Sequence, residues 1–152
     1  MNDLLLVIVA SASPISELRG GIPLGIGLGF EPAFTYAVAV TTNILVYFPA
    51  RLVLTGLYSK VLRHVPLFDR YLLRVRTTGK PRVDKYGLLG LALFVAVPLP
   101  ITGAYTGTVL SWLLAMDWKR SFVGVAIGVM VAGCIVMALT LGVIVAVPLL
   151  AR

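Results

Sequence analysis

The sequence SPISELRGGIPLGIGLG, Ser13–Gly29, decides how the rest of the chain folds. It places an acid, Glu17, and a base, Arg19, inside a hydrophobic run. It also contains two prolines and five glycines, residue types that interrupt helices. We interpret this stretch as the bent tip of a helical hairpin that enters a membrane and carries a polar site at the bend.

The composition of the whole chain is that of an integral membrane protein. Of its 152 residues, 59% are hydrophobic and only 12% are charged. Soluble domains have about 45–50% apolar and about 25% charged residues. The length allows one domain with a handful of membrane segments. The single cysteine, Cys134, excludes an internal disulfide or a cysteine metal cluster.

Two short apolar arms flank the charged pair. Leu4–Ser16 is free of charge for 13 residues and Gly20–Phe30 for 11. A helix rises about 1.5 Å per residue, so each arm covers roughly 16–20 Å of a hydrocarbon core about 30 Å thick. The two arms therefore form either one long span with charges at its centre or a re-entrant hairpin bent near residues 17–23.

A full membrane span is predicted at residues 33–57, which carry no charge as far as Ala50. Asn43 is the strongly polar residue in its interior and suits an interhelical hydrogen bond. Pro49 is expected to kink the last turns of this span. Arg51 is expected to extend its side chain toward the lipid headgroups.

The polar segment of residues 58–85 contains eight of the thirteen basic residues. Its apolar residues recur at helical spacing and arginines occupy the other face, which predicts a short interfacial helix. Thr77–Pro81 reads as a turn that ends this helix. The positive charge predicts that the linker is cytoplasmic and attracted to anionic lipid headgroups.

A second broken segment and a second span follow the linker. Residues 86–116 carry no charge, but the sequence VPLPITGAYTG interrupts them near the middle. Residues 121–151 form the second span, with glycines suited to close helix contact. Short boundaries with charged residues, 30–32 and 117–120, precede the two spans. The order of broken segment, boundary and span thus occurs twice, at an offset of roughly 83–88 residues, as in the internal repeats of transporters.

The positions of lysine and arginine favour re-entrant hairpins over four complete spans. With four spans, Lys119 and Arg120 would face the side opposite the basic linker, which the positive-inside rule disfavours. With two re-entrant hairpins, they join the linker in the cytoplasm. We therefore predict an all-α integral membrane protein in which two opposed re-entrant hairpins and two full spans form an inverted repeat. This single domain, 1–152, consists of a hairpin plus span in 1–57, the basic linker in 58–85, and a hairpin plus span in 86–152.

The candidate site for substrate and proton combines polar and helix-breaking residues of both broken segments. Broken helices at membrane depth line wet cavities and direct N–H groups into them, which suits an anionic headgroup. Glu17 is the candidate proton carrier and Arg19 the candidate phosphate or carboxylate ligand, although these two can also simply neutralise each other. In the second segment, the hydroxyls either line a cavity or cap carbonyls freed by a packed kink. The full set is Glu17, Arg19, Gly20, Gly21, Pro23, Pro98, Pro100, Thr102, Gly103, Tyr105 and Thr106.

Two stretches resemble the small multi-drug export protein family of prokaryotic membrane proteins: SELRGGIPLGIGLG at 16–29 and KYGLLGLALFVAVPLPITGAYTGTVLSWLLAMDWKRSF at 85–122. The family name implies export of small compounds. The paired hairpins are also similar to the wider DedA superfamily, whose members are implicated in moving polyprenyl-phosphate carriers or other lipids. Glu17 matches the acid that DedA proteins place in the first hairpin, whereas VAVPLPITG lacks the arginines that they place around the second.

These observations predict a transporter in the prokaryotic cell membrane, not an enzyme, with no cofactor, metal or nucleic-acid partner. The favoured function is proton-coupled translocation of an amphipathic anionic substrate such as a polyprenyl-phosphate lipid. The alternatives are export of small cationic drugs, and an uncoupled lipid scramblase or structural membrane protein. Because such a small bundle leaves much lipid-facing surface and its last helix is rich in glycine, we also predict a homodimer.

Overall fold

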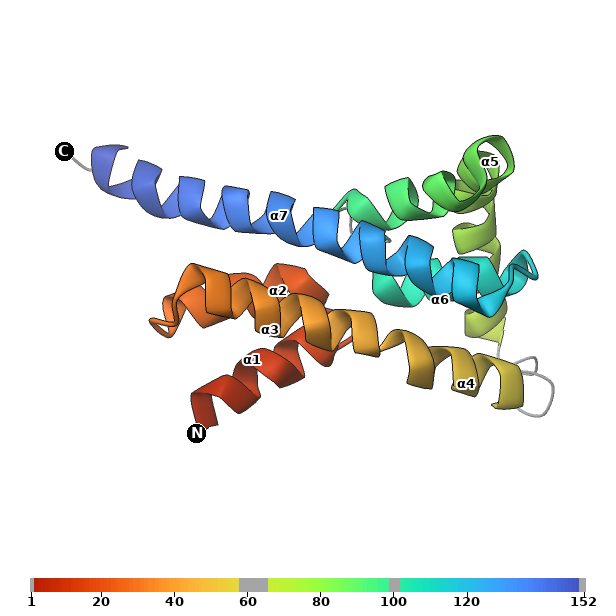
Figure 1. Ribbon diagram of the computed structural model, residues 1–152, viewed down its shortest axis with the longest axis horizontal. Helices are drawn as coiled ribbons and strands as arrows, with labels where there is room; N and C mark the ends of the chain where they lie inside the picture. Colours follow the sequence, from red (N-terminus) through yellow and green to blue (C-terminus); the bar gives the residue numbers. More distant parts are fainter. Residues whose placement is uncertain (1, 58–65, 99–101, 151–152) are drawn as a thin grey trace. The chain divides into compact units, whose positions relative to one another are not determined.

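The computed structural model describes residues 2–57, 66–98 and 102–150, which form helices and their connections with no strand among them (Figure 1). The predicted all-α class is confirmed for this part of the chain. The helices are α1 Asn2–Ala12, α2 Glu17–Gly27, α3 Pro32–Leu45, α4 Tyr47–Leu57, α5 Pro66–Ala96, α6 Ala104–Leu113 and α7 Trp118–Leu150. The first part of the predicted linker, 58–65, lies outside the described residues.

The chain divides into two compact units. The first unit comprises Met1–Asn43 and Met130–Arg152, and the second comprises Ile44–Val129. The first therefore contains α1, α2, most of α3 and the C-terminal part of α7, whereas the second contains the last two residues of α3, all of α4, α5 and α6, and the N-terminal part of α7. Each unit has its own buried apolar core, represented by Val7, Ile22 and Ala39 in the first and by Phe94, Leu110 and Val125 in the second.

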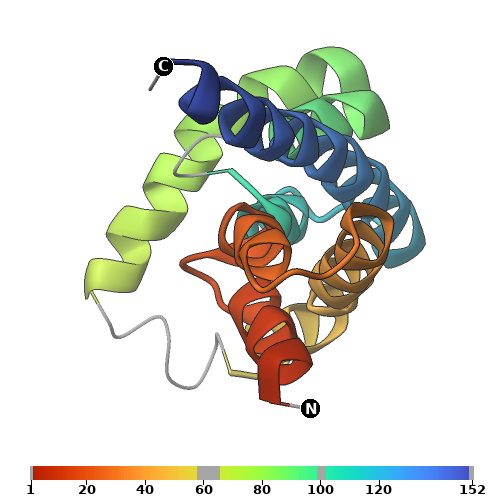
Figure 2. The ribbon, with the colours of Figure 1, turned by 90° about the vertical axis from the view of Figure 1, so that its left-hand side faces the viewer.

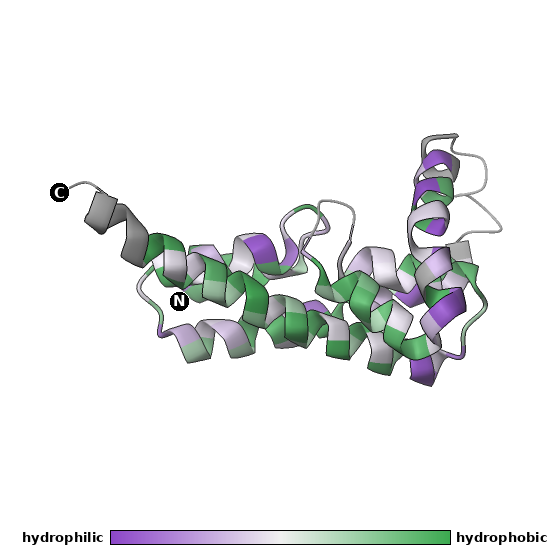
Figure 3. Cartoon of the chain, turned by 90° about the horizontal axis from the view of Figure 1, so that it is seen from above, coloured by the Kyte–Doolittle hydropathy of each residue, from purple (hydrophilic) through white to green (hydrophobic). Residues whose placement is uncertain are grey.

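Two helical segments are long and apolar enough to cross a membrane by length and composition. They are Pro32–Gly56 and Trp118–Ile144, which overlap the predicted spans 33–57 and 121–151. Figure 3 shows α7 as predominantly hydrophobic. The first segment is interrupted at Val46, between α3 and α4. Pro49 has no N–H to donate to the carbonyl of Leu45, which accounts for an interruption at this point of the helix, while the predicted kink stays a prediction.

The first broken segment forms a helical hairpin in which α2 runs back alongside α1 (Figure 1). The chain turns at Ser13–Ser16, and the backbone N–H of Glu17 donates to the carbonyl of Ser13 at 3.0 Å. The predicted bend near residues 17–23 is therefore wrong. Pro23 lies inside α2 on an exposed face, and Pro14 marks the turn because its ring and missing N–H cannot continue α1.

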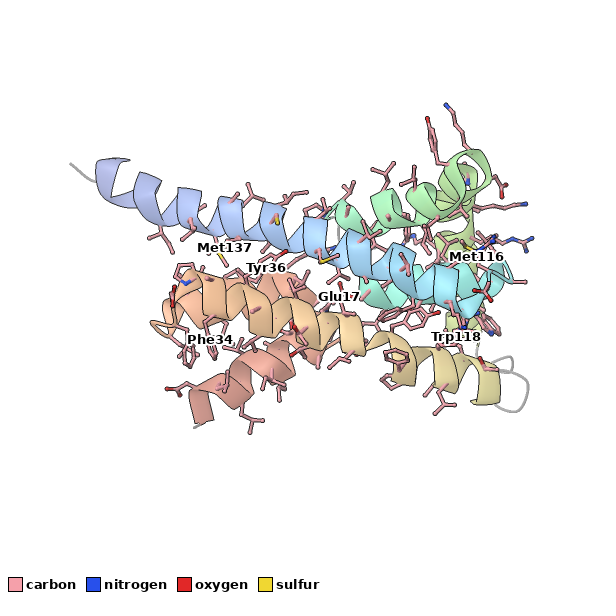
Figure 4. All side chains as sticks on the ribbon, in the orientation of Figure 1. Glu17, Phe34, Tyr36, Met116, Trp118 and Met137 are labelled. Atoms are coloured by element: carbon pink, nitrogen blue, oxygen red, sulfur yellow. The ribbon has the colours of Figure 1, made fainter. Side chains whose placement is uncertain are left out.

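The first unit also pairs α3 with the C-terminal part of α7. The hydroxyl of Tyr36 donates to the carbonyl of Met130 at 2.9 Å and lies 3.4 Å from the sulfur of Cys134. Figure 4 labels Tyr36 on α3 and Met137 on α7. Gly133 makes this approach possible, because a Cβ at this position would lie 2.8 Å from the Tyr36 ring.

In the second unit, α5 changes direction at Gly87, whose backbone has φ 56° and ψ −124° (Figures 1 and 2). A residue with a Cβ rarely adopts such a conformation, which is why glycine occupies this position. The predicted turn at Thr77–Pro81 is wrong, because the helix continues through Pro81. A Cβ at Gly79 would meet the side chain of Leu110 at 2.2 Å, so close packing against α6 outweighs the weak helix propensity of this stretch.

The first part of α5 is amphipathic, as predicted. Leu72, Val75 and Val83 are buried. The opposite surface is polar (Figure 3), and its exposed basic side chains are Arg70, Arg74, Arg76 and Lys85. The latter part of α5 packs against α6 to form the second helical hairpin. The order of hairpin, boundary and long helix thus occurs in both halves of the chain, while their inverted relation stays a prediction.

Three of the glycines in α7 contact other helices of the same chain. A Cβ at Gly124, Gly128 or Gly133 would lie within 3.1 Å of a side chain of α5 or α3. A Cβ at Gly142 would meet nothing within 4 Å. The small-residue surfaces that suggested a dimer are therefore largely used within the chain.

Gly128→Ala is expected to destabilise the protein by about 1–3 kcal/mol, because overpacking a close contact costs this much. Its new Cβ would lie 2.5 Å from the Cβ of Val95 and 2.7 Å from the carbonyl oxygen of Ala92, and a backbone atom cannot rotate away. Thermal unfolding in detergent measures the effect. Gly142→Ala, the same substitution at an open position of the same helix, is the control and should leave the melting temperature unchanged or slightly raised.

Candidate functional site

The tip of the first hairpin holds Glu17 in an unusual backbone conformation. Glu17 is the first residue of α2 and has φ 48°, in the left-handed region. For a residue other than glycine, this conformation costs about 1–2 kcal/mol. The hydroxyl of Ser16 donates to the carbonyl of Ala10 and so ties the start of α2 to the end of α1. Such strained residues cluster at functional sites, where the surrounding contacts hold them.

Glu17 and Arg19 differ in how far they are covered. Glu17, which is labelled in Figure 4, has an ionisable side chain, yet the residue is only 9% exposed. Arg19 is half-buried and interacts electrostatically with Glu17. An acid in the first turn of a helix is also favoured by the positive end of the helix dipole. The two predicted ionisable groups therefore do lie together, at the start of α2.

Ser11 of α1 and Thr35 of α3 lie against the buried face of α2, and Asn43 of α3 is bonded to α1. The amide nitrogen of Asn43 donates to the carbonyl of Ser11 at 2.8 Å, the interhelical hydrogen bond predicted for Asn43. Ser11 Oγ and Asn43 Oδ1 are buried and have no hydrogen-bond partner among the described residues, and the same is true of Thr35 Oγ1. Sequence reasoning did not select Ser11, whose position in a run of small residues gave no signal.

Two glycines of α2 make room for these side chains. A Cβ at Gly21 would lie 2.0 Å from Ser11 Oγ, and a Cβ at Gly25 would lie 2.5 Å from Cγ2 of Thr35. Glu17, Gly21 and Gly25 are all buried and follow each other at intervals of one helical turn. The buried face of α2 therefore carries the carboxyl group of Glu17. Next to it, the side chains of Ser11 and Thr35 occupy the space that Gly21 and Gly25 leave open.

The predicted helix breakers of this stretch have other roles. Gly20 and Gly21 lie within α2 rather than at the bend. A Cβ at Gly20 would come 2.5 Å from the Cβ of Ser16, so Gly20 allows the turn to fold back on the helix. Pro23 is exposed and away from the buried face that carries Glu17.

The predicted residues of the second broken segment belong to the second unit. Gly103 has φ 156° and ψ −167°, a conformation essentially restricted to glycine. The hydroxyl of Thr102 donates to the carbonyl of Val97, and that of Thr106 to the carbonyl of Gly103. These bonds fit the interpretation of a kink whose hydroxyls cap freed carbonyls. The remaining predicted residues are Pro98, in the connection after α5, Tyr105, half-buried on α6, and Pro100, which lies outside the described residues.

Arg51 of α4 has an unexpected role in the second unit. Its guanidinium donates to Ser111 Oγ at 3.1 Å and to the carbonyl of Met116 at 3.0 Å. It thus holds the C-terminal end of α6, a contact that the sequence did not indicate, while its position relative to the headgroups stays a prediction. Near it, Tyr47 donates to the carbonyl of Trp118 at 2.9 Å. Sequence reasoning missed these contacts because the acceptors come from a distant part of the chain.

Arg51→Lys is expected to destabilise the protein by about 1.5–3 kcal/mol, the usual contribution of a hydrogen bond to a charged group. A single ammonium group cannot reproduce the planar fork that reaches two acceptors. The melting temperature in detergent measures this loss. Arg76→Lys, the same change at an exposed position of α5, should alter stability by no more than about 0.5 kcal/mol. Equal melting temperatures for both variants would contradict a role for Arg51.

Within the described part of the chain, no group of three or more His, Cys, Asp or Glu residues could hold a metal ion. The family model described as "Putative small multi-drug export protein" matches residues 17–135, which run from the start of α2 into α7. No curated protein and no solved structure matches the chain.

Proposed function

The chain belongs to the small multi-drug export protein family, and from this premise we propose that it moves an amphipathic anionic substrate across the membrane with Glu17 as the proton carrier. A polyprenyl-phosphate lipid is the proposed substrate, because it combines a long apolar chain with an anionic head. The substrate head binds at the tip of the first hairpin. After the substrate is released, protonation of Glu17 allows the empty binding site to face the first side of the membrane again.

The short helices of the hairpins support a re-entrant arrangement. Helices α1 and α2 have 11 residues each and α6 has 10. At about 1.5 Å per residue, each reaches roughly half of a hydrocarbon core about 30 Å thick. In this arrangement the tip of the first hairpin lies near the middle of the membrane, where an ionisable residue is costly and usually functional.

The single observation that carries the proposal is the state of Glu17 at this tip. Its backbone is held in the left-handed region, and its side chain is only 9% exposed. A carboxyl group in such surroundings can be neutralised by a proton and can then cross a low-dielectric region at little cost. Its neighbour Arg19 carries the planar fork that binds phosphate through two hydrogen bonds.

The basic residues support a cytoplasmic position for α5. The first part of α5 exposes several arginines, and Lys119 and Arg120 are exposed at the start of α7. Asp117 accepts hydrogen bonds from the backbone N–H groups of Lys119 and Arg120 at 3.0 and 3.1 Å and so caps α7. We place this end of α7 and the linker on the cytoplasmic side, in agreement with the positive-inside rule.

Purified protein in vesicles with an imposed pH gradient tests this function. Fluorescently labelled polyprenyl phosphate should move between leaflets faster in vesicles with protein than without, and collapse of the gradient should slow this movement. Neutral labelled polyprenol should not be moved, because it lacks the charged head. Equal movement of both lipids would contradict recognition of the phosphate.

Export of small cationic drugs is the second candidate, favoured by the buried acid Glu17 as a counter-charge within a multi-drug export family. The neighbouring positive charge of Arg19 opposes it. Lipophilic cations added to the same vesicles distinguish the two functions. Gradient-dependent movement of the cation, with none of the lipid phosphate, would replace the first proposal by the second.

We also propose that the protein is a homodimer, since the many exposed apolar side chains of α7 and α3 leave lipid-facing surface for a second copy. Among the α7 glycines discussed above, Gly142 is the one with open space at its Cβ. Native mass spectrometry in mild detergent should detect the dimer, and a monomer at all concentrations would refute it.

A further inference from the structure

Two buried oxygen atoms at the first hairpin, Ser11 Oγ and Asn43 Oδ1, have no hydrogen-bond partner in the described part of the chain. Ser11 is 0% exposed and Asn43 1%. Buried polar groups are normally paired, and an unpaired one requires an explanation such as a bound ion or water. Both atoms can donate electron pairs to a cation, and the two residues are joined by a hydrogen bond from the Asn43 amide to the Ser11 carbonyl.

Their common position follows from the contacts of Ser11. Asn43 donates to the carbonyl of Ser11, which fixes the other atom of the same amide, Oδ1, beside the end of α1. Ser11 Oγ lies 2.0 Å from where a Cβ of Gly21 would be, so the hydroxyl is directed at α2. Glu17 lies one turn before Gly21 on the same buried face. The hydroxyl thus faces Gly21, the amide is bonded to the same residue of α1, and Glu17 lies one helical turn from Gly21 on the buried face of α2.

The local electrostatics favour a cation at this point. Helix α1 ends at Ala12, next to Ser11, and the C-terminal end of a helix carries partial negative charge. In transporters, the C-terminal ends of broken helices and their free carbonyls coordinate coupling cations. Arg19 interacts with the same carboxyl group, so its positive charge competes with a bound cation.

From these contacts we infer that Ser11, Glu17 and Asn43 bind a sodium ion. The donor set is made of oxygens, which hard cations prefer over softer metals. A monovalent ion adds less charge than a divalent ion to a buried site in which Arg19 already interacts with the carboxylate. The inference rests on the proposed function only because that function places Glu17 at the depth of the membrane. The sodium ion is proposed to bind when no substrate is bound.

Binding of ²²Na⁺ to the purified full chain, in detergent and with choline as the background cation, tests the site. Wild-type protein should bind ²²Na⁺ saturably, and unlabelled Na⁺ should displace it while choline should not. Ser11→Ala and Glu17→Gln should each weaken this binding at least about tenfold, because each removes a ligand atom or its charge. Thr35→Val is the matched control, since it removes an equally buried hydroxyl that lies beside Gly25 instead, and it should bind as wild type does.

Thermal unfolding provides a second readout that checks folding. In choline chloride all variants should melt like the wild type, and replacement of choline by sodium should raise the melting temperature of wild type and Thr35→Val alone. Absence of saturable binding by the folded wild type would overturn the inference. Binding of sodium by Ser11→Ala and Glu17→Gln with the affinity of the wild type would also overturn it. Transport measured in sodium-free vesicles separates the two proposals, because lipid movement driven by a pH gradient there supports the proposed function whatever the sodium result.

Discussion

Glu17→Gln is expected to reduce pH-gradient-driven transport at least about a hundredfold, the scale on which removal of a proton-transferring group slows a reaction. Glutamine preserves the size of the side chain and the backbone conformation but cannot gain or lose a proton. Initial rates of labelled lipid movement in vesicles, compared at equal amounts of protein, give the measurement. Folding should be retained, because glutamine has nearly the same size and shape as the buried glutamate side chain that it replaces.

Glu31→Gln is the matched control for this result. Glu31 is exposed, immediately before α3, and the substitution is chemically identical. Its transport rate should equal that of the wild type. If Glu17→Gln retained the wild-type rate and its response to the gradient, Glu17 would not be the proton carrier.

Gly21→Leu is expected to have the largest effect on folding. A Cβ at this position would lie 2.0 Å from Ser11 Oγ, 3.0 Å from Ser11 Cβ and 3.3 Å from its backbone Cα. The hydroxyl could rotate away, but the rest of a leucine side chain has no room between α1 and α2. We expect a loss of about 3 kcal/mol or more, at the upper end of overpacking costs. A melting temperature lowered by about 2–4 °C for each kcal/mol would report it.

Gly27→Leu makes the same change in the same helix where a Cβ would meet nothing within 4 Å. It should leave the melting temperature close to that of the wild type. The double variant Ser11→Gly with Gly21→Ala removes the obstructing side chain and should melt nearer to wild type than Gly21→Leu. A Gly21→Leu protein as stable as Gly27→Leu would contradict the close packing of the hairpin.

Much of the fold could be predicted from hydrophobic run length and charge. The two long helical segments could be located because a run of about twenty apolar residues is long enough to cross a bilayer as a helix, which pairs its own backbone N–H and C=O groups. The family was also predicted correctly from its two motifs. An interruption near Pro49 could be expected from the missing N–H of proline, which acts locally, and the helix is interrupted at Val46.

The positions of the bends were harder to predict, because proline does not always break a helix. Pro23 and Pro81 were interpreted as breakers, yet both lie inside helices. Close packing of Gly21 on Ser11, and of Gly79 on Leu110, holds these helices across the lost hydrogen bond. Such contacts join residues that are distant in sequence, so no local pattern reveals them.

The candidate site was predicted in part. Glu17 and Arg19 were selected because charges within an apolar run are costly, and they interact at the start of α2. Ser11 was missed, and Asn43 was assigned a structural hydrogen bond but no ligand role. Their significance depends on unpartnered buried oxygens, which can be recognised only once the neighbours of each atom are known.

Proton movement during lipid translocation tests the central claim most directly. Vesicles that contain a trapped pH-sensitive dye and the purified protein receive polyprenyl phosphate on one side, without an imposed gradient. We predict a change in lumenal pH that grows with the amount of lipid translocated, and no such change with neutral polyprenol or with Glu17→Gln. Translocation of the lipid by the wild type without any change in lumenal pH would contradict the proposed coupling through Glu17.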